Sequence, residues 1–432
     1  MWEYAPVLVL VLSFVYLLAI GTPVAWSIAI SSTLTMLVSI PLMPALTTVS
    51  QRMATGLDSF ALLAIPFFVL SGELMNRGGI AHRLIAFAKT LVGALPGGLA
   101  LINVIAAMLM GAIAGSAMAS ASAMGSILGP EMEKEGYSKE FGAAINITSS
   151  TTGLIIPPSN VLIVYSLASG GVSIAALFLA GYIPGILTGL FLMMVAVFWA
   201  KKKKYPVGER SSIKEVFTTF WNALPSLLLL FIVIGGIVTG VFTATEASAI
   251  AVLYTLILGF IYKEITVKNV PSILLNSSST TAIVMLLIGA SMSMSWVMSY
   301  ENIPQNISDV LLNISDNKIV ILLIINLLLL LVGIFMDMTP AVLIFTPIFL
   351  PVVTKLGMDP THFGIIMVLN LCIGLCTPPV GSVLFVGVGV AKTTIEKVVR
   401  PLLPMFIAMI IALMFVTYIP GLTLWLPKMF GY

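Results

Sequence analysis

Four short polar clusters interrupt the apolar stretches of this 432-residue chain, and they are its candidates for chemistry. Two of them, at residues 115–122 and 336–340, separate consecutive apolar runs. The other two, at residues 149–158 and 374–379, each end in a Pro-Pro pair. Proline lacks an N–H donor and clashes with the preceding turn, so each pair should break a helix. A break frees carbonyl groups that can bind a cation, and the helix that restarts can attract an anion.

Asp337 is the strongest single candidate for a functional residue, because it lies between the apolar runs 319–335 and 341–353. A lone carboxylate inside a membrane is costly, so a partner or a bound ion is expected there. Two simpler interpretations remain open. Asp337 could be a loop residue in water, or it could cap the helix that begins near Thr339 and Pro340.

Other reactive side chains do not suggest catalysis. Cys372 and Cys376 have no third metal ligand beside them, so packing is the favoured role. Glu73 lies near the end of its apolar segment and can pair with Arg77 four residues later. The chain has no Walker A motif, no HExxH and no GxSxG with triad partners. The sequence therefore predicts neither ATP hydrolysis nor an enzyme.

The composition excludes a water-soluble protein. Hydrophobic residues make up 59% of the chain and charged residues 9%, against the ~25% charged residues of a soluble domain. This excludes an ordinary soluble enzyme, a disordered protein and a nucleic-acid-binding module. The net charge of +3 is too small to indicate a polyanionic partner. We therefore expect the lipid bilayer to cover most of the surface.

Eight apolar segments approach the ~20 residues that a helix needs to cross a membrane. They are residues 6–23, 25–49, 59–76, 173–200, 222–241, 246–262, 279–299 and 401–419.

Two stretches of a different kind, residues 77–170 and 300–392, match each other. Adding 221 to the residue number carries Gly153 onto Gly374, and it carries the first Pro-Pro pair onto the second. Each stretch has the same order of parts: an amphipathic segment, two apolar runs around a polar break, and a helix interrupted by Pro-Pro. The sequence therefore predicts a repeat, with a helical hairpin and a broken helix in each copy.

The positive charges predict that the repeats are inverted. If residues 201–204 lie inside the cell, all but four of the 20 basic residues fall on that side, as the positive-inside rule requires. Both termini then lie outside, and the two hairpins open toward opposite sides, which is typical of secondary transporters. The runs 98–114 and 117–131 are short for two full crossings, so we favour re-entrant hairpins.

The predicted fold is thus an all-α polytopic membrane protein with inverted repeats, two re-entrant hairpins and two broken helices. It divides into N-terminal scaffold helices (1–76), an amphipathic arm helix (77–96), a first repeat core (97–170), scaffold helices (171–299) with a cytoplasmic basic loop (201–215), a second arm helix (300–316), a second repeat core (317–392) and a C-terminal helix (393–432).

Several motifs resemble the large membrane subunit of tripartite ATP-independent periplasmic (TRAP) transporters. They are Gly115-Ser116, residues 125–132, Gly136-Tyr137-Ser138 and residues 155–159, with support from residues 65–68, 336–340 and 346–351. The resemblance covers nearly the whole chain. Two features depart from the family pattern: the Ala- and Met-rich hairpin tip from Ala117 to Met124, and Cys376 in the second break.

The resemblance implies a Na⁺-coupled importer of the bacterial inner membrane that moves like an elevator and uses no ATP. A periplasmic binding protein would deliver the solute, and a small four-helix membrane subunit, as a separate chain, would complete the assembly. The solute would be an organic acid, either a C4-dicarboxylate or a sialic acid such as N-acetylneuraminate. The chain looks closer to the sialic-acid branch.

Carried over residue by residue, the resemblance also implies two Na⁺ sites and a solute site between them. The first Na⁺ site would contain Ser116, Ser149, Ser150 and Gly153. The second would contain Asp337, Thr339, Gly374, Cys376 and Thr377. The solute site would contain Thr152, Asn160 and Ser382, with helix starts at Pro158 and Pro379 facing the carboxylate of the solute.

Two alternatives remain. A stand-alone Na⁺/anion cotransporter could share this architecture and need no partner. A channel or a membrane assembly scaffold is also possible, although a channel would need rings of charged residues, which the sequence does not show.

Overall fold

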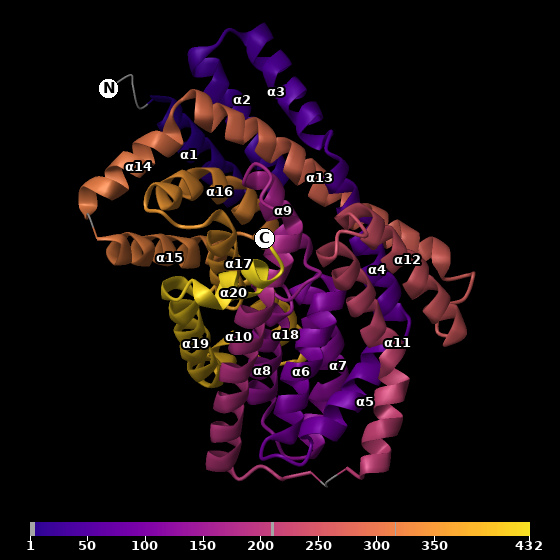
Figure 1. Ribbon diagram of the computed structural model, residues 1–432. Helices are drawn as coiled ribbons and strands as arrows, with labels where there is room; N and C mark the ends of the chain where they lie inside the picture. The colour runs from indigo at the N-terminus through magenta and orange to yellow at the C-terminus, as the bar shows by residue number, and fades with distance from the viewer. Residues whose placement is uncertain (1–4, 209–210, 316) are drawn as a thin grey trace.

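The computed structural model of the chain describes residues 5–208, 211–315 and 317–432, and these residues form helices and turns without a strand (Figure 1). The all-α prediction is confirmed. Residues 1–4 of the predicted N-terminal scaffold, residues 209–210 of the predicted basic loop and residue 316 of the predicted second arm lie outside the described residues.

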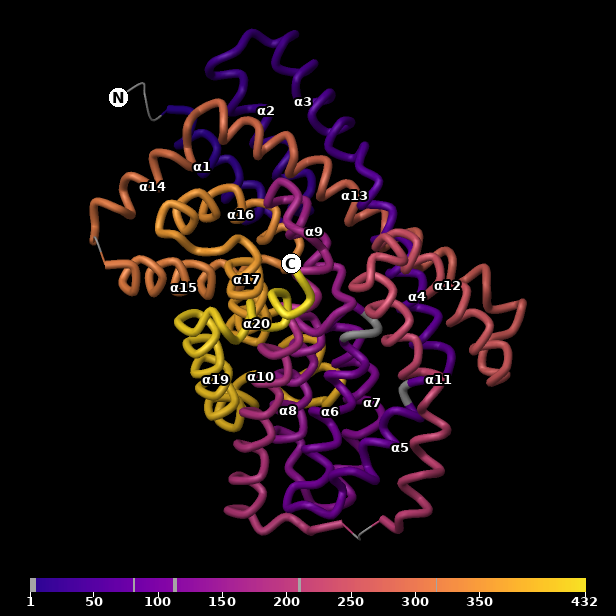
Figure 2. The backbone as a smooth tube through the Cα atoms, in the orientation of Figure 1, coloured from indigo at the N-terminus to yellow at the C-terminus, as the bar shows by residue number. Residues whose placement is uncertain are grey.

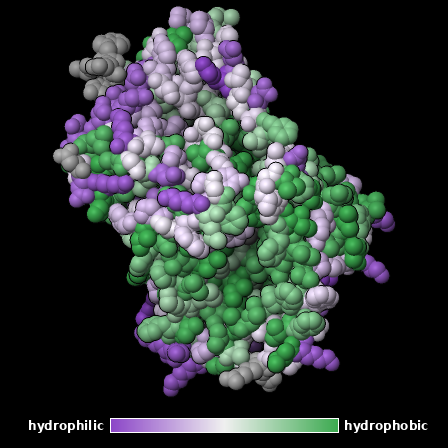
Figure 3. Space-filling view, in the orientation of Figure 1, coloured by the Kyte–Doolittle hydropathy of each residue, from purple (hydrophilic) through white to green (hydrophobic). Residues whose placement is uncertain are grey.

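Eight helices of the described chain are long and apolar enough to cross a membrane. They are α4 with the turn before it (Phe60–Arg77), α10 (Ile174–Lys203), α11 (Ile213–Val238), α12 (Ala244–Ile261), α13 (Val270–Tyr300), α15 (Lys318–Phe335), α16 (Met338–Lys355) and α19 (Ile395–Tyr418). Figure 3 shows the matching surface, a broad hydrophobic zone bordered by hydrophilic residues above and below. These helices support the prediction of a chain that crosses the membrane several times.

The prediction of one continuous membrane segment at residues 25–49 is wrong. The structure has two helices there, α2 (Val24–Ser39) and α3 (Leu42–Leu57), after α1 (Ala5–Ala19). Between them, Ile40 has an extended backbone with φ −131° and ψ 138°. The ring of Pro41 disfavours a helical conformation for the residue before it, so the helix ends at this point. A similar interruption at Pro420 separates α19 from a last short helix, α20 (Gly421–Met429).

Each predicted repeat forms a pair of helices followed by a broken helix. The first contains α6 (Gly98–Ala114), α7 (Ala117–Lys134), α8 (Lys139–Thr152) and α9 (Asn160–Ala168). The second contains α15, α16, α17 (Pro360–Leu375) and α18 (Ser382–Val390). The re-entrant and inverted arrangement of these helices stays a prediction.

The two repeats interlock. Within each repeat, the first hairpin helix packs on the first half of the broken helix: α6 on α8 and α15 on α17 (Figure 2). Between repeats, the restarted helix packs on the opposite hairpin, since α9 contacts α16 and α18 contacts α7. Because each hairpin is held by helices from both halves of the chain, the eight helices form one packed unit.

The two amphipathic arms form helices α5 (Ile80–Val92) and α14 (Ile303–Ile314). Helix α5 packs on α6 and α11, and α14 packs on α16. The apolar stripe of α5 is buried at its start, at Ile80 and Leu84, whereas Leu91 is 52% exposed. Each arm thus contacts the hairpin of its own repeat.

Glycine lets the backbone of each hairpin touch the backbone of a broken helix. A Cβ atom on Gly111 of α6 would lie 2.5 Å from the Cα of Gly153 in the first break. A Cβ atom on Gly374, at the end of α17, would lie 2.5 Å from the Cα of Gly333 in α15. The same contact therefore occurs once in each repeat, and only a residue without a side chain fits it.

Buried polar side chains strengthen both contacts. Ser149 Oγ on α8 donates to Asn103 Oδ1 on α6 over 3.0 Å. Asn370 Nδ2 on α17 donates to Asn326 Oδ1 on α15 over 2.6 Å. Each bond joins the first hairpin helix to the broken helix of the same repeat. Polar bonds of this kind hold helices together in lipid, where packing alone has no water to exclude.

The glycine contact predicts a large effect for one methyl group. Gly374→Ala should destabilise the protein by about 1–3 kcal/mol, because the new methyl meets backbone that cannot rotate away. Thermal unfolding of the purified protein in detergent measures the effect as a lower midpoint.

Gly235→Ala in α11 is the matched control. Nothing lies within 4 Å of the position that a Cβ atom would take there, and alanine favours a helix by about 1 kcal/mol over glycine. The control should unfold at the temperature of the unmodified protein or slightly above it. Equal midpoints for both variants would contradict the role assigned to the close contact.

Candidate functional site

One cavity of about 270 Å³ lies where the hairpin tips meet the restarted helices. It brings together five of the residues that the sequence predicts for ion and solute binding. They are Ser116, Asp337 and Thr339 from the tips, and Asn160 and Ser382 from the first residues of α9 and α18. Residues more than 260 positions apart along the chain thus share one small volume.

The first tip is a sharp turn that presents Ser116. Gly115 has φ +61°, and a Cβ atom there would lie 2.8 Å from Asn160 Nδ2, so both conformation and space require glycine. Ser116 then caps α7, because its hydroxyl accepts a hydrogen bond from the Ala119 N–H over 3.3 Å. The tip is therefore seated directly on the start of α9.

Asp337 occupies the corresponding position before α16. Its backbone is extended, with φ −70° and ψ 161°, as at a helix N-cap. Its side chain makes no capping hydrogen bond, unlike Ser116, and it is exposed to the cavity that it lines. The capping interpretation is thus correct for the position of Asp337 but not for its carboxylate, which faces the cavity without that bond.

Four helices begin at this cavity, namely α7, α9, α16 and α18. The N-terminus of a helix carries a partial positive charge of roughly half an elementary charge. Two side-chain atoms at these starts, Asn160 Oδ1 and Ser382 Oγ, are buried and have no hydrogen-bond partner in the protein. A buried polar atom without a partner costs about 1–3 kcal/mol, so a ligand or water is expected beside them.

The hydroxyl groups predicted around the first break lie outside the cavity lining. Ser150 Oγ donates to Asn146 O over 2.6 Å and Thr152 Oγ1 to Ser149 O over 2.6 Å, within α8 itself. In the second break, Thr377 Oγ1 donates to Ile373 O over 2.8 Å. These hydroxyl groups thus donate their hydrogen bonds to carbonyl groups of their own helices. What the breaks offer to a ligand is therefore chiefly backbone.

Neighbouring helices also pack closely on both breaks. Gly153 and Gly374 are covered by the first hairpin helices, as described above. Pro158 and Pro379 follow them in the connecting segments, each as the second residue of a cis Pro-Pro bond. In the first segment, the Ser159 hydroxyl donates to Leu154 O over 2.5 Å. Neither proline lines the cavity.

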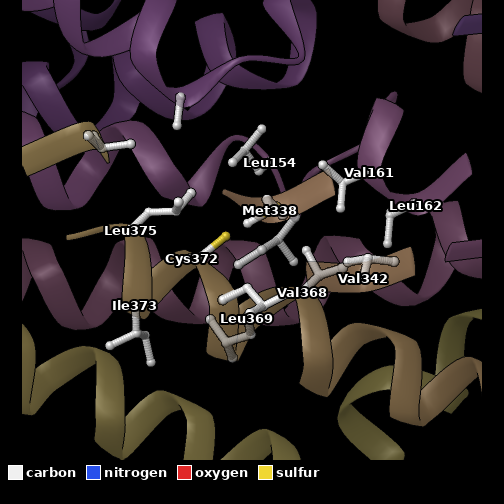
Figure 4. Close-up of a cluster of buried hydrophobic side chains, with 14 of the residues drawn as sticks. Leu154, Val161, Leu162, Met338, Val342, Val368, Leu369, Cys372, Ile373 and Leu375 are labelled. Carbon is white, nitrogen blue, oxygen red and sulfur yellow. The ribbon is translucent and has the colours of Figure 1, made fainter. Parts of the chain in front are cut away.

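The two cysteines link the broken helices to each other. The thiol of Cys372 donates to Thr151 O over 3.3 Å, and the thiol of Cys376 donates to Ile147 O over 3.4 Å. Both residues are fully buried. Figure 4 shows Cys372 among apolar side chains of both repeats, including Leu154 and Leu369. This agrees with a packing role, and no group of three His, Cys, Asp or Glu residues comes together in the described chain.

The sequence did not predict the opposite wall of the cavity. That wall comes from α4 and α13, which pack together, and its polar residues are Glu73, Asn76, Asn276, Ser277 and Thr280. The predicted pair of Glu73 and Arg77 is confirmed, with 2.9 Å between Oε1 and Nε. The only signal for this wall was polar residues at helical spacing, inside the predicted apolar segment 59–76 and at the start of the segment 279–299 or just before it.

The comparison with known proteins identifies the family of the chain. The family model described as "Tripartite ATP-independent periplasmic transporter, DctM component" matches residues 11–422. YgiK of Salmonella typhimurium is 58% identical over 431 residues, covering 100% of this chain and 99% of that protein. The C4-dicarboxylate TRAP transporter large permease protein DctM of Rhodobacter capsulatus is 37% identical, covering 96% and 97%. The sialic acid TRAP transporter large permease protein SiaM of Vibrio cholerae is 40% identical, covering 89% and 90%.

A solved structure shares the fold. The YdaH transporter of Alcanivorax borkumensis superposes with a TM-score of 0.68, covering 96% of this chain and 98% of its own. At 12% identity, this likeness concerns the fold alone. The family match spans nearly the whole chain, and the relatives match over nearly their whole length. The chain therefore belongs to the DctM component of the tripartite ATP-independent periplasmic transporters.

Proposed function

We propose that this chain is the Na⁺-coupled membrane subunit of an importer for an organic acid in the bacterial inner membrane. Its family is a family of transporter components, and the chain has several helices of membrane length. The solute would be an organic acid, such as a sialic acid or a C4-dicarboxylate, because relatives are named for both. Both termini would lie in the periplasm.

One observation carries the proposal: a single cavity receives both hairpin tips and the starts of both restarted helices. The helix starts favour the carboxylate of a solute. The unpartnered atoms Asn160 Oδ1 and Ser382 Oγ supply polar groups that a solute would satisfy. Anion and cation would therefore bind close together, so that the binding of one could favour the binding of the other.

The donor atoms fit Na⁺. Carboxylate, hydroxyl and carbonyl oxygens suit a hard cation, and both tips and both breaks offer them. Asp337, Thr339 and the break at 374–377 would hold one ion, and Ser116 with the break at 149–153 would hold the other. Bound Na⁺ would compensate the charge of Asp337 and of the solute. Because most of the polar side chains in the breaks bond to their own helices, carbonyls would supply most of these ligands.

Two partners complete the proposal. A periplasmic binding protein would deliver the solute, and a small membrane subunit would join the scaffold helices to form the static part. The interlocked helices α6–α9 and α15–α18 would move together against that part, as in an elevator. Three kinds of contact support the idea that these eight helices move as one unit. They are the packing between the repeats, the glycine contacts between hairpins and breaks, and the thiol hydrogen bonds between α17 and α8.

Removing the carboxylate at the second tip tests the ion site. Asp337→Ala should abolish Na⁺-driven uptake of the solute in cells that carry all three components, while the amount of protein in the membrane stays unchanged. Asp309→Ala is the control, because Asp309 is exposed on α14 and lies 3.9 Å from Lys355, away from the cavity. Normal uptake by the Asp337 variant would remove Asp337 from the site.

Closing the first break tests the role of the interrupted helix. Replacing Pro157 and Pro158 with alanine restores two N–H donors and removes the steric cause of the break. Helix α8 should then extend, the start of α9 should leave the cavity, and uptake should fall by at least about tenfold, a barrier change of ~1.4 kcal/mol. Pro206→Ala, outside the helices, is the control. Unchanged uptake by the double variant would show that transport does not need this break.

A further inference from the structure

The charges around the cavity are unevenly placed. Two carboxylates line it, Asp337 at the hairpin end and Glu73 at the opposite wall. No lysine, arginine or histidine of the described chain is among its lining residues. A solute with negative charge therefore finds positive potential only at the helix starts and at bound cations.

With Na⁺ compensating the charge of Asp337, as proposed above, the hairpin end is suited to one carboxylate. Four of the helices that line the cavity, α7, α9, α16 and α18, begin at that end, so the partial positive charges of their N-termini converge there. Asn160 Oδ1 and Ser382 Oγ lie at two of these starts without a partner. One anionic group can face the helix starts while neighbouring hydroxyl groups of the solute donate to these two oxygens.

The opposite wall is suited to uncharged polar groups. Ser277 on α13 is only 5% exposed, and its hydroxyl has no hydrogen-bond partner in the protein. Asn76 Oδ1 on α4 is also buried without a partner. Asn276 and Thr280 complete the polar lining contributed by α13. A hydroxyl or an amide of the solute can both donate to and accept from such groups, whereas a carboxylate can only accept.

Glu73 makes this wall unfavourable for a second carboxylate. Its Oε1 accepts hydrogen bonds from Arg77 Nε over 2.9 Å and from Asn276 Nδ2 over 3.4 Å. Arg77 does not line the cavity, and its Nη1 is bound to Ser272 Oγ over 2.9 Å. The acidic member of the ion pair is thus the one that faces the solute. A like charge on the solute would be repelled there.

We propose that the cavity selects organic acids with one carboxylate and several hydroxyl or amide groups, and rejects dicarboxylates, with Glu73 as the residue that sets this preference. The inference rests on the proposed function and names the class of its solute. The carboxylate lies at the hairpin end and the uncharged polar groups lie against α4 and α13. Glu73 acts by its charge on the far end of the solute.

Two pairs of acids that differ at one end test the proposal. D-gluconate and D-glucarate share a six-carbon hydroxylated chain, and glycerate and tartronate share a three-carbon one. In each pair, only the second acid carries another carboxylate. The dissociation constants are measured on the purified full chain in Na⁺, from the rise of the thermal unfolding midpoint with acid concentration. The monocarboxylate of at least one pair should bind about tenfold more tightly than its diacid partner.

Glu73→Gln separates the charge of Glu73 from its shape. Glutamine keeps an oxygen that can accept from Arg77, so the fold should hold while the repulsion disappears. The preference for the monocarboxylate should fall to within about twofold, chiefly through tighter binding of the diacid. Glu133→Gln is the matched control, because Glu133 also pairs with a basic residue, Lys139, at 3.3 Å but does not line this cavity. The control should keep the preference of the unmodified chain.

The outcomes distinguish the inference from the proposed function. Na⁺-dependent binding of the diacids at equal or higher affinity would overturn the inference and leave organic-acid transport standing. A preference that Glu73→Gln does not reduce would overturn the role of Glu73. If none of the four acids stabilises the chain in Na⁺ or in K⁺, the inference fails, whereas the proposed function is decided by the Na⁺-driven uptake of the Asp337 variant.

Discussion

The structure depends on one constraint: a helix interrupted among apolar neighbours must satisfy the backbone groups that the interruption frees. Side chains satisfy some of these groups, since Ser159 Oγ donates to Leu154 O and Thr377 Oγ1 donates to Ile373 O. A second helix also packs against each interruption, with glycine on both sides. Gly111 lies on Gly153, and Gly333 lies on Gly374. Each contact is reinforced by a polar bond one or two helical turns away, Asn103 with Ser149 and Asn326 with Asn370. Each hairpin is therefore fixed to the broken helix of its own repeat.

This attachment explains how distant residues form one site. Once α6 and α15 are fixed to the broken helices, the tips that follow them point toward the helices that restart after each break. The exchange of α9 and α18 between the repeats brings all four helix starts to the same cavity. The thiols of Cys372 and Cys376 then join the two broken helices to each other. The site has few polar groups, and the packing of the helices brings them together in this one cavity.

Much of this arrangement was predictable from local sequence. Pro-Pro pairs, glycines and the equal order of parts located both breaks and both tips, because those features act on the backbone where they occur. The cavity wall on α4 and α13 was not predictable in the same way. Glu73, Asn76 and Ser277 look like ordinary polar residues of two apolar helices, and only tertiary packing turns them toward the tips. The role of Asn103 and Asn326 was also missed, because each needs a partner more than 40 residues away.

The same reasoning explains two differences in detail. Ser150 and Thr377 were predicted for the ion sites and Thr152 for the solute site, yet each hydroxyl bonds to a carbonyl of its own helix. A side chain in a helix can always reach the preceding turn, and sequence alone does not say whether it does. The segment 25–49 looks continuous in hydropathy, because hydropathy does not register how Pro41 acts on Ile40. In both cases the sequence pattern was a poor guide. A hydrogen bond to the preceding turn or a steric clash with a neighbouring proline decided the local structure.

The central claim is that anion and cation are bound in one cavity and cross the membrane together. It is tested most directly by reconstituting the chain with its small membrane subunit and its binding protein in vesicles. Solute uptake is then measured with an inward Na⁺ gradient or with an equal K⁺ gradient. The solute should accumulate with Na⁺ alone, and only when all three proteins are present. Equal uptake in K⁺, or a conductance independent of Na⁺, would contradict it.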